Sequence, residues 1–437
     1  MAAIITPLLG LIDVAVLARA AETEALAGAS LAGAVFSLLY WSFGFLRMSL
    51  SGLSAQALGE DNEARLRRYL LQGLLIGAGA GLLLLLLGIP IQAAARLVLV
   101  EGSEASPGAA AAMDTYIGIR LLAAPFAVAT TAILGWLTGQ GRTRLLMLVT
   151  SAIALINAGL SVLFVLGLGY GIAGLAAATA LAETAGFLIG LACVAHVAGS
   201  RGGWRSGWPL ASIREGIGVV LGLNRDIFLR TVLLDIVFLS FARFGAELGD
   251  LTLAANHVLL NLVLTATLLL DGPAIAAETF VGQAAGASGD RSRLFASAWR
   301  SALAPAVLLA LTLCAVLIVF GQPLLTLTIG DQAGGAEVLS EARRFLPWLA
   351  LMPVTVAGAY YLDGVFIGAT RGRDLRNTMA VSTLFFLGTA LHLTDRFGNH
   401  GLWAALLLFM LVRTAALLTR WPSLAAQITA PRDVKAG

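Results

Sequence analysis

The sequence predicts an all-α integral membrane protein with twelve transmembrane helices. Of its 437 residues, 59% are hydrophobic and only 12% are charged, whereas soluble domains carry about 25% charged residues. The mean hydropathy is +0.89. Apolar stretches long enough to cross about 30 Å of hydrocarbon recur along the whole chain. Their length favours helices over barrel strands, because in lipid every backbone polar group must be satisfied inside a helix or a closed barrel.

The limits of the predicted helices follow from charged or Gly/Pro-rich segments between the apolar stretches. The helices run at about 3–19, 26–57, 67–99, 113–138, 144–168, 171–198, 225–246, 251–286, 294–320, 338–369, 377–394 and 400–420. Several exceed about 25 residues, so tilted or kinked helices are expected. The natural kink points are prolines inside these stretches or near their ends: Pro90, Pro125, Pro273, Pro305, Pro347 and Pro353.

A long polar segment near the middle of the chain, residues 199–216, divides the helices into two sets of six. The sequence therefore predicts four parts: an amino-terminal six-helix bundle over 1–200, a cytoplasmic loop over 201–214, a carboxy-terminal six-helix bundle over 215–420 and a cytoplasmic tail over 421–437.

A weak internal repeat relates the two halves. Residues 51–69 align with residues 278–295, so that Gln56 matches Gln283 and Gly59 matches Gly286. Because each half has an even number of helices, both enter the membrane in the same orientation, and the repeat is parallel. Two similar bundles around a central cavity are typical of alternating-access transport.

The distribution of arginine predicts the orientation. Loops after even-numbered helices hold thirteen arginines, and loops after odd-numbered helices hold six together with several acids. Positively charged loops stay in the cytoplasm. We therefore expect a multi-pass protein of the cell's plasma (inner) membrane with both termini in the cytoplasm.

Charge and cysteine content exclude several other classes. The net charge of +3 is too small to indicate a nucleic-acid partner. Cys193 and Cys314 both lie in apolar stretches, which argues against a disulfide framework and a thiolate metal site. The four histidines have no metal-ligand spacing.

Acidic residues within the predicted helices are the first candidates for chemistry. Six of them lie well away from the predicted helix ends: Asp13, Glu183, Asp235, Asp271, Glu278 and Asp363. Each costs about 2.5 to 3.5 kcal/mol on insertion scales. A carboxyl group in apolar surroundings favours its neutral form and is suited to carry a proton. The alternative role, a carboxylate paired with an arginine or capped by backbone amides, is favoured for Asp235 and Glu183.

Three further sets of residues have open roles. Asp271 and Glu278 lie seven residues apart and share one helix face, and with Asp363 they are candidates for a charge site in the carboxy-terminal half or for buried struts. Arg47 keeps its charge and needs a partner, so a structural ion pair is expected. Helix 2 also carries aromatic and sulfur side chains that would suit flat cations if they line a cavity, although most are expected to face lipid or other helices: Phe36, Tyr40, Trp41, Phe43, Phe45 and Met48.

Several motifs together resemble one transporter family. They are PLLGLIDVAVLAR, FGFLRMSLSGLSAQALGEDN, GWLTGQGRTR, GLNRDIFLR, LLDGPAIAAETFVGQAAGA, YLDGVFIGATRGRDLRN and FGNHGLWAALLLF. Together they resemble the motifs of the multidrug and toxic compound extrusion (MATE) transporters, specifically the DinF branch. The resemblance keeps the same register over almost the whole chain. The resemblance implies two six-helix bundles related by a pseudo-twofold axis, forming a V that opens alternately to either side. It also implies exchange of a proton or sodium ion for organic, amphipathic and often cationic compounds.

The resemblance also implies a coupling site in the amino-terminal half. Asp13 is the motif aspartate, and Asn157 and Thr179 match family positions that line the same cavity. Ser161 stands where the family often has a second acid, so proton coupling through Asp13 is favoured over a sodium site at Asp13 and Asn157. Met1 is only twelve residues before Asp13. The family's upstream proline is absent, and helix 1 is expected to be truncated.

Two alternative functions remain. A flippase for lipid-linked intermediates would need several deep cations, of which Arg47 and Arg120 are the chief examples. A membrane-embedded enzyme would need a motif such as DDxxD, HExxH or GxSxG, and none occurs. We therefore expect a monomeric transporter that binds small organic substrates and membrane lipids, with no cofactor besides the coupling ion. The substrate itself is not predictable, because polyspecific sites have apolar walls with few polar anchors.

Overall fold

The computed structural model describes residues 16, 23–101, 106–201, 208–330 and 335–430. Throughout these residues the regular structure is helical, with no β-strand. This confirms the predicted all-α class. Seven of the described helices are long and apolar enough to cross a membrane, and two bent pairs raise that number to nine.

The chain divides into two compact units, Met1–Ser54 with Asn62–Val220 and Ala55–Asp61 with Leu221–Gly437. The helices up to residue 200 are α2 (Thr23–Ser42), α3 (Gly44–Gly59), α4 (Glu63–Leu86), α5 (Gly88–Leu99), α6 (Pro107–Leu121), α7 (Ala124–Gly139), α8 (Thr143–Ser161), a π-helical turn η1 (Val162–Gly167) and α9 (Gly171–Ser200). Those that follow are α11 (Ile217–Glu247), α12 (Asp250–Thr267), α13 (Asp271–Gly286), α14 (Arg291–Ile329), α15 (Gly335–Arg344), α16 (Leu346–Gly368), α17 (Gly372–Phe397) and α18 (Asn399–Thr429).

Three breaks in the helices coincide with prolines that the sequence singles out, whereas Pro305 and Pro353 lie inside the continuous helices α14 and α16. Pro125 and Pro347 lie in the first turns of α7 and α16, directly after breaks, and Pro273 lies in the first turn of α13. The axes bend by 57° between α6 and α7 and by 42° between α12 and α13. Proline is tolerated in a first turn because the N–H that it lacks would have no helical acceptor there.

Several predicted helix limits are wrong. The fourth and seventh predicted helices start too late, because α6 begins at Pro107 and α11 at Ile217. Two predicted C-terminal ends come too early. The ninth predicted helix ends at about residue 320, but α14 continues to Ile329 with Pro323 inside it. The twelfth ends at about residue 420, but α18 continues to Thr429 with Pro422 inside it. A proline removes one backbone hydrogen bond without necessarily ending a helix, since the neighbouring turns can remain formed.

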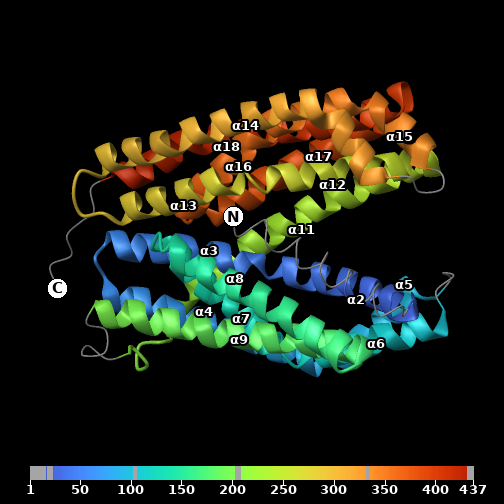
Figure 1. Ribbon diagram of the computed structural model, residues 1–437. Coiled ribbons are helices and arrows are strands. Elements are labelled where there is room, and N and C mark those ends of the chain that lie inside the picture. Colours follow the sequence, from blue (N-terminus) through green and yellow to red (C-terminus); the bar gives the residue numbers. More distant parts are fainter. Residues whose placement is uncertain (1–15, 17–22, 102–105, 202–207, 331–334, 431–437) are drawn as a thin grey trace. The chain divides into compact units, whose positions relative to one another are not determined.

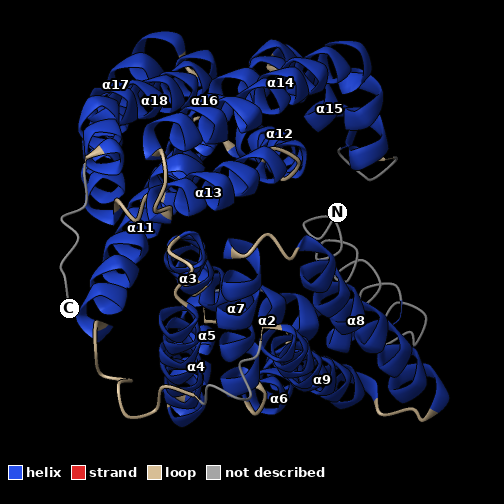
Figure 2. Cartoon of the chain, turned by 90° about the vertical axis from the view of Figure 1, so that its left-hand side faces the viewer, coloured by secondary structure: helices blue, strands red, loops and turns tan. Residues whose placement is uncertain are grey.

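In the first unit, α9 packs against both α6 and α8, and α2 packs against α6 (Figure 2). In the second unit, α16 packs against α14 and α18, which run along it (Figure 1). The core of the second unit is rich in fully buried aromatic rings: Phe241, Phe345, Phe386, Trp403 and Phe409.

The repeated segments predicted from the sequence contact each other reciprocally within the second unit. A Cβ atom at Gly59 would collide with the carbonyl oxygen of Gln283, and one at Gly286 would collide with that of Gln56. The ends of α3 and α13 therefore cross at a distance that only glycine allows. The aligned pairs Gln56/Gln283 and Gly59/Gly286 thus occupy equivalent positions in this crossing.

The ends of α7 and α16 also repeat one pattern. The N–H of Gly141 donates to Thr138 O at 2.8 Å, with φ of +67° at Gly141, and the N–H of Thr370 donates to Ile367 O at 2.8 Å, with φ of +55°. A β-branched residue is strained in this conformation. Gln56 Nε2 donates to Thr370 Oγ1 at 3.1 Å and to Gly368 O at 3.0 Å, which holds this turn in the second unit.

Candidate functional site

The candidate coupling site begins with a hydrogen bond between α8 and α9. Asn157 and Thr179 are both buried, and Asn157 Nδ2 donates to Thr179 Oγ1 at 2.9 Å. Thr179 in turn donates to the carbonyl of Leu175, one turn back on α9, at 3.1 Å. The Oδ1 atom of Asn157 is buried with no hydrogen-bond partner among the described residues. The structure therefore brings these two predicted residues together and leaves one buried acceptor available.

Ser161 lies one turn after Asn157, at the end of α8, and is fully buried. The six residues that follow form the π-helical turn η1. Its wider backbone is visible in the bond from the N–H of Leu168 to the carbonyl of Leu163, five residues back, at 2.9 Å. Such turns are rare and frequent at functional sites. Nothing in the sequence of this segment predicts it.

Asp13, the centre of the predicted coupling site, lies outside the described residues. Val16, three residues later, is described and buried. The role of Asp13 therefore stays a prediction.

Glu183 forms a buried ion pair with Arg120. Arg120 donates to Glu183 Oε1 through Nε at 3.2 Å and through Nη2 at 2.8 Å. Tyr40 Oη donates to the other carboxylate oxygen, Oε2, at 3.3 Å. Glu183 is one turn from Thr179 on α9, Arg120 belongs to α6 and Tyr40 to α2. The arginine pairing favoured for Glu183 from the sequence is thus confirmed.

In the second unit, Asp363 on α16 binds two arginines. Arg230 of α11 and Arg413 of α18 both donate to its Oδ2 atom. The side chains of all three are at least nine-tenths buried. Two guanidinium groups bind this one carboxylate, so Asp363 is an ion-pair centre that links three helices.

The other two acids of the predicted carboxy-terminal charge site, Asp271 and Glu278, both lie on α13. Asp271 is the first residue of α13, at the bend after α12, and Glu278 is buried two turns later. Asp235 lies on α11 five residues after Arg230 and is half-buried. Their roles stay predictions.

Arg47 lies in the first turn of α3, packed near α7, because a Cβ atom at Gly135 would collide with the carbonyl oxygen of Arg47. Its Nη1 atom is buried and has no hydrogen-bond partner within the described part of the chain. The structural ion pair expected for Arg47 therefore also stays a prediction.

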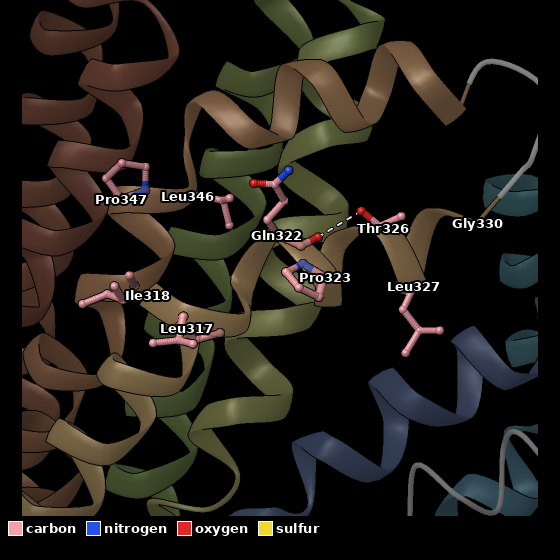
Figure 3. A pocket seen from close by; sticks show the side chains of 11 residues that line it. Leu317, Ile318, Gln322, Pro323, Thr326, Leu327, Gly330, Leu346 and Pro347 are labelled. Atoms are coloured by element: carbon pink, nitrogen blue, oxygen red, sulfur yellow. Dashed lines mark hydrogen bonds between the residues drawn. The ribbon is translucent and has the colours of Figure 1, made fainter.

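An open, mainly apolar groove of about 1060 Å³ lies between α14 and α16 (Figure 3). Thr326 donates to the carbonyl of Gln322 beside Pro323, at 3.0 Å. None of the predicted site residues lines this groove. Its walls are formed by Leu317, Ile318, Val319, Gln322, Pro323, Thr326, Leu327, Gly330, Leu346, Pro347 and Ala350.

Sequence reasoning missed two deep cations, Arg230 and Arg413. Arg413 is a single arginine in the apolar stretch LLLFMLVRTAALL. The cost argument that singles out Asp13 applies to this arginine as well, so the signal was present. What the sequence does not show is that both arginines share one carboxylate.

Comparisons with known proteins bear on the whole chain. The MatE family model matches residues 1–163 and 227–391. DNA damage-inducible protein F of Escherichia coli (strain K12) is 39% identical over 421 residues, which are 96% of this chain and 88% of that protein. The probable multidrug resistance protein NorM of Bradyrhizobium diazoefficiens is 26% identical, over 95% of this chain and 89% of its own length.

Solved structures show the same fold. A crystal structure of MATE in the bent conformation superposes with a TM-score of 0.83 at 18% identity, covering 98% of this chain and 93% of that one. The eukaryotic MATE transporter AtDTX14 gives 0.80 at 19% identity, covering 97% and 94%. From its sequence relatives and its fold, the chain belongs to the MATE family, in the DinF branch, and is a multi-pass membrane transporter of the multidrug and toxic compound efflux type rather than an enzyme.

Proposed function

We propose that this transporter exports organic, amphipathic and often cationic compounds in exchange for protons, and that protonation of Asp13 is the coupling switch. The observation that carries the proposal is the buried Oδ1 atom of Asn157, whose amide group already binds Thr179. A neutral carboxyl group can donate a hydrogen bond to such an acceptor, whereas a carboxylate can only accept. Protonation of Asp13 would therefore create a bond to Asn157, and deprotonation would break it.

The preference for protons over sodium rests on Ser161. Its hydroxyl group stands where the resemblance places a second acid, so the site has one carboxylate fewer to balance a bound cation. Sodium at Asp13 and Asn157 is the less favoured alternative. A proton needs only one titrating carboxyl group and a partner for its neutral form.

In the carboxy-terminal half, Asp271, Glu278 and Asp363 are the candidates for a second charge site or for buried struts. Asp363 already binds Arg230 and Arg413. Pairing of this kind bears on the flippase alternative, because Arg120, Arg230 and Arg413 are each paired with a carboxylate. A pyrophosphate would have to compete with those acids.

The orientation is part of the proposal: a monomer in the plasma membrane with both termini in the cytoplasm, as the arginine distribution predicts. A carboxy-terminal green fluorescent protein should fluoresce, and a carboxy-terminal alkaline phosphatase should be inactive. The opposite pair of results would reverse the orientation.

The test of coupling is dye efflux in inverted membrane vesicles under an imposed pH gradient or an imposed sodium gradient. We expect transport of an amphipathic cationic dye to follow the pH gradient and to ignore the sodium gradient. Asp13→Asn should abolish gradient-driven transport while leaving membrane insertion intact. Normal transport by Asp13→Asn would refute the role of Asp13 as the coupling switch. Transport that responds only to the sodium gradient would show that sodium, and not the proton, is the coupling ion.

A further inference from the structure

The guanidinium group of Arg120 lies in a cage of three aromatic rings. The distances from its central carbon to the ring centroids are 4.3 Å for Phe36, 5.2 Å for Tyr40 and 5.9 Å for Tyr116. The rings also pack on one another, with centroids 5.4 Å apart for Phe36 and Tyr40 and 6.1 Å apart for Phe36 and Tyr116. Glu183 completes the cage with a carboxylate. A ring set and an acid of this kind are how proteins bind guanidinium and quaternary ammonium ions.

An ion pair alone would not require this arrangement. Glu183 satisfies Arg120 through two hydrogen bonds, at 3.2 and 2.8 Å. Phe36 is almost completely buried and offers no hydrogen bond, yet it is the ring nearest to the cation. The cage therefore contributes attraction for a cation beyond the ion pair, and that attraction does not depend on the cation belonging to the protein.

The ion pair inside the cage is partly exposed. The side chain of Arg120 keeps 17% of its surface exposed, and that of Glu183 keeps 10%. Neither side chain is therefore completely buried. A ligand with a cationic head could place that head in the cage and leave its remaining part at the surface.

Two helix breaks lie beside the cage. Arg120 is the second-last residue of α6, directly before the 57° bend into α7. Tyr40 lies two residues before the end of α2, where the chain breaks at Phe43 before α3 begins. A side chain next to a break can be displaced by changing a few backbone dihedrals, without moving a whole helix.

We infer that Phe36, Tyr40, Tyr116 and Glu183 form a binding site for the head of an organic monocation, and that Arg120 occupies this site as a tethered ligand. A passenger cation then competes with Arg120 for Glu183 and the rings. The inference rests on the proposed function in one respect only: the site belongs to an exporter of cationic compounds. The inference adds the location of a cation-binding site and identifies Arg120 as the group that competes with the passenger for it.

The test uses equilibrium binding to the purified full-length protein in lipid nanodiscs, with methylguanidinium and tetramethylammonium as probes in isothermal titration calorimetry. Arg120→Ala empties the cage and should bind both ions at least tenfold more tightly than the wild-type protein does. Arg120→Lys keeps a tethered cation and should bind like the wild type. Adding Glu183→Gln to Arg120→Ala should remove the gain.

A second measurement tests the inference even if Arg120→Ala is less stable than the wild-type protein. Thermal unfolding of Arg120→Ala should shift upward by several degrees in millimolar methylguanidinium chloride, but not in the same concentration of sodium chloride. The inference is overturned if Arg120→Ala binds no better than the wild type, if the gain survives Glu183→Gln, or if methylguanidinium and sodium act alike. Because no ion gradient is present, these results do not depend on the coupling ion. A failure of proton coupling appears only in the vesicle assay.

Discussion

Asp363 and Arg413 meet in the core of the second unit although they are 50 positions apart in the chain, and Arg230 donates to the same oxygen of Asp363. Asp363→Asn removes the single negative charge that the two buried guanidinium groups share. An uncompensated buried charge of this kind costs about 3–5 kcal/mol. We expect a clearly lower unfolding temperature, measured in detergent by fluorescence-detected size exclusion.

Arg413→Met is the matched comparison for Asp363→Asn, because it leaves Asp363 paired with Arg230 and replaces a fully buried side chain by one of similar length. It should destabilise the protein less. Equal losses for the two variants would show that the pairing with Arg230 does not compensate the carboxylate.

The crossing of α3 and α13 gives a second prediction. Gly59→Ala places a methyl group against the carbonyl of Gln283, which is backbone and cannot rotate away. Overpacking of this kind costs about 1–3 kcal/mol. Gly33→Ala on α2 is the control, since a Cβ atom there has nothing within 4 Å. It should leave stability unchanged or raise it by up to about 1 kcal/mol. A neutral Gly59→Ala would mean that the crossing adjusts freely.

The hydrogen bond between Asn157 and Thr179 gives a third prediction. Thr179→Val keeps the side-chain shape and removes the hydroxyl that Asn157 binds. We expect proton-driven dye efflux to fall by about tenfold, equivalent to about 1.4 kcal/mol, with normal insertion. Thr184→Val removes a hydroxyl that bonds only within α9, to Ala180 O, and should retain transport. Equal activity of the two variants would remove Thr179 from the coupling site.

A buried amide network in the second unit gives a fourth prediction. Asn256 Oδ1 accepts from Asn399 Nδ2 at 2.9 Å and from Trp403 Nε1 at 2.8 Å, and Asn256 Nδ2 donates to Asn399 Oδ1 at 2.7 Å. Asn256→Ala leaves buried polar groups unsatisfied, at about 1–3 kcal/mol. Thermal unfolding should detect this loss. Asn261→Ala, at an exposed site on the same helix, should be nearly neutral, and a similar loss there would contradict the explanation.

The positions of the helices were predictable because apolar stretches must match the thickness of the bilayer. The breaks were predictable where proline marks them, as at Pro125 and Pro347. The extensions of α14 and α18 were not, because Pro323 and Pro422 are accommodated inside helices that the sequence suggests should already have ended. A proline shows where one hydrogen bond is missing and does not show whether the helix resumes.

The candidate site was predictable one residue at a time, but its pairings were not. The cost of burying a charge singles out Glu183 and Asp363, and the same argument applies to Arg413. Which groups meet depends on helix rotation and packing, so Arg120 with Glu183 and the two arginines with Asp363 became visible only in the fold. The π-helical turn after Ser161 belongs to the same class of features, because it depends on one extra residue in a turn rather than on composition.

Thr179 and Glu183 stand one turn apart on α9, a single unbroken helix of 30 residues. Because the helix is continuous, a rotation of α9 at Glu183 also rotates it at Thr179. A small molecule bound between Glu183 and the rings would therefore also restrict the movement of Thr179. Such a molecule would slow ion exchange without contacting the ion.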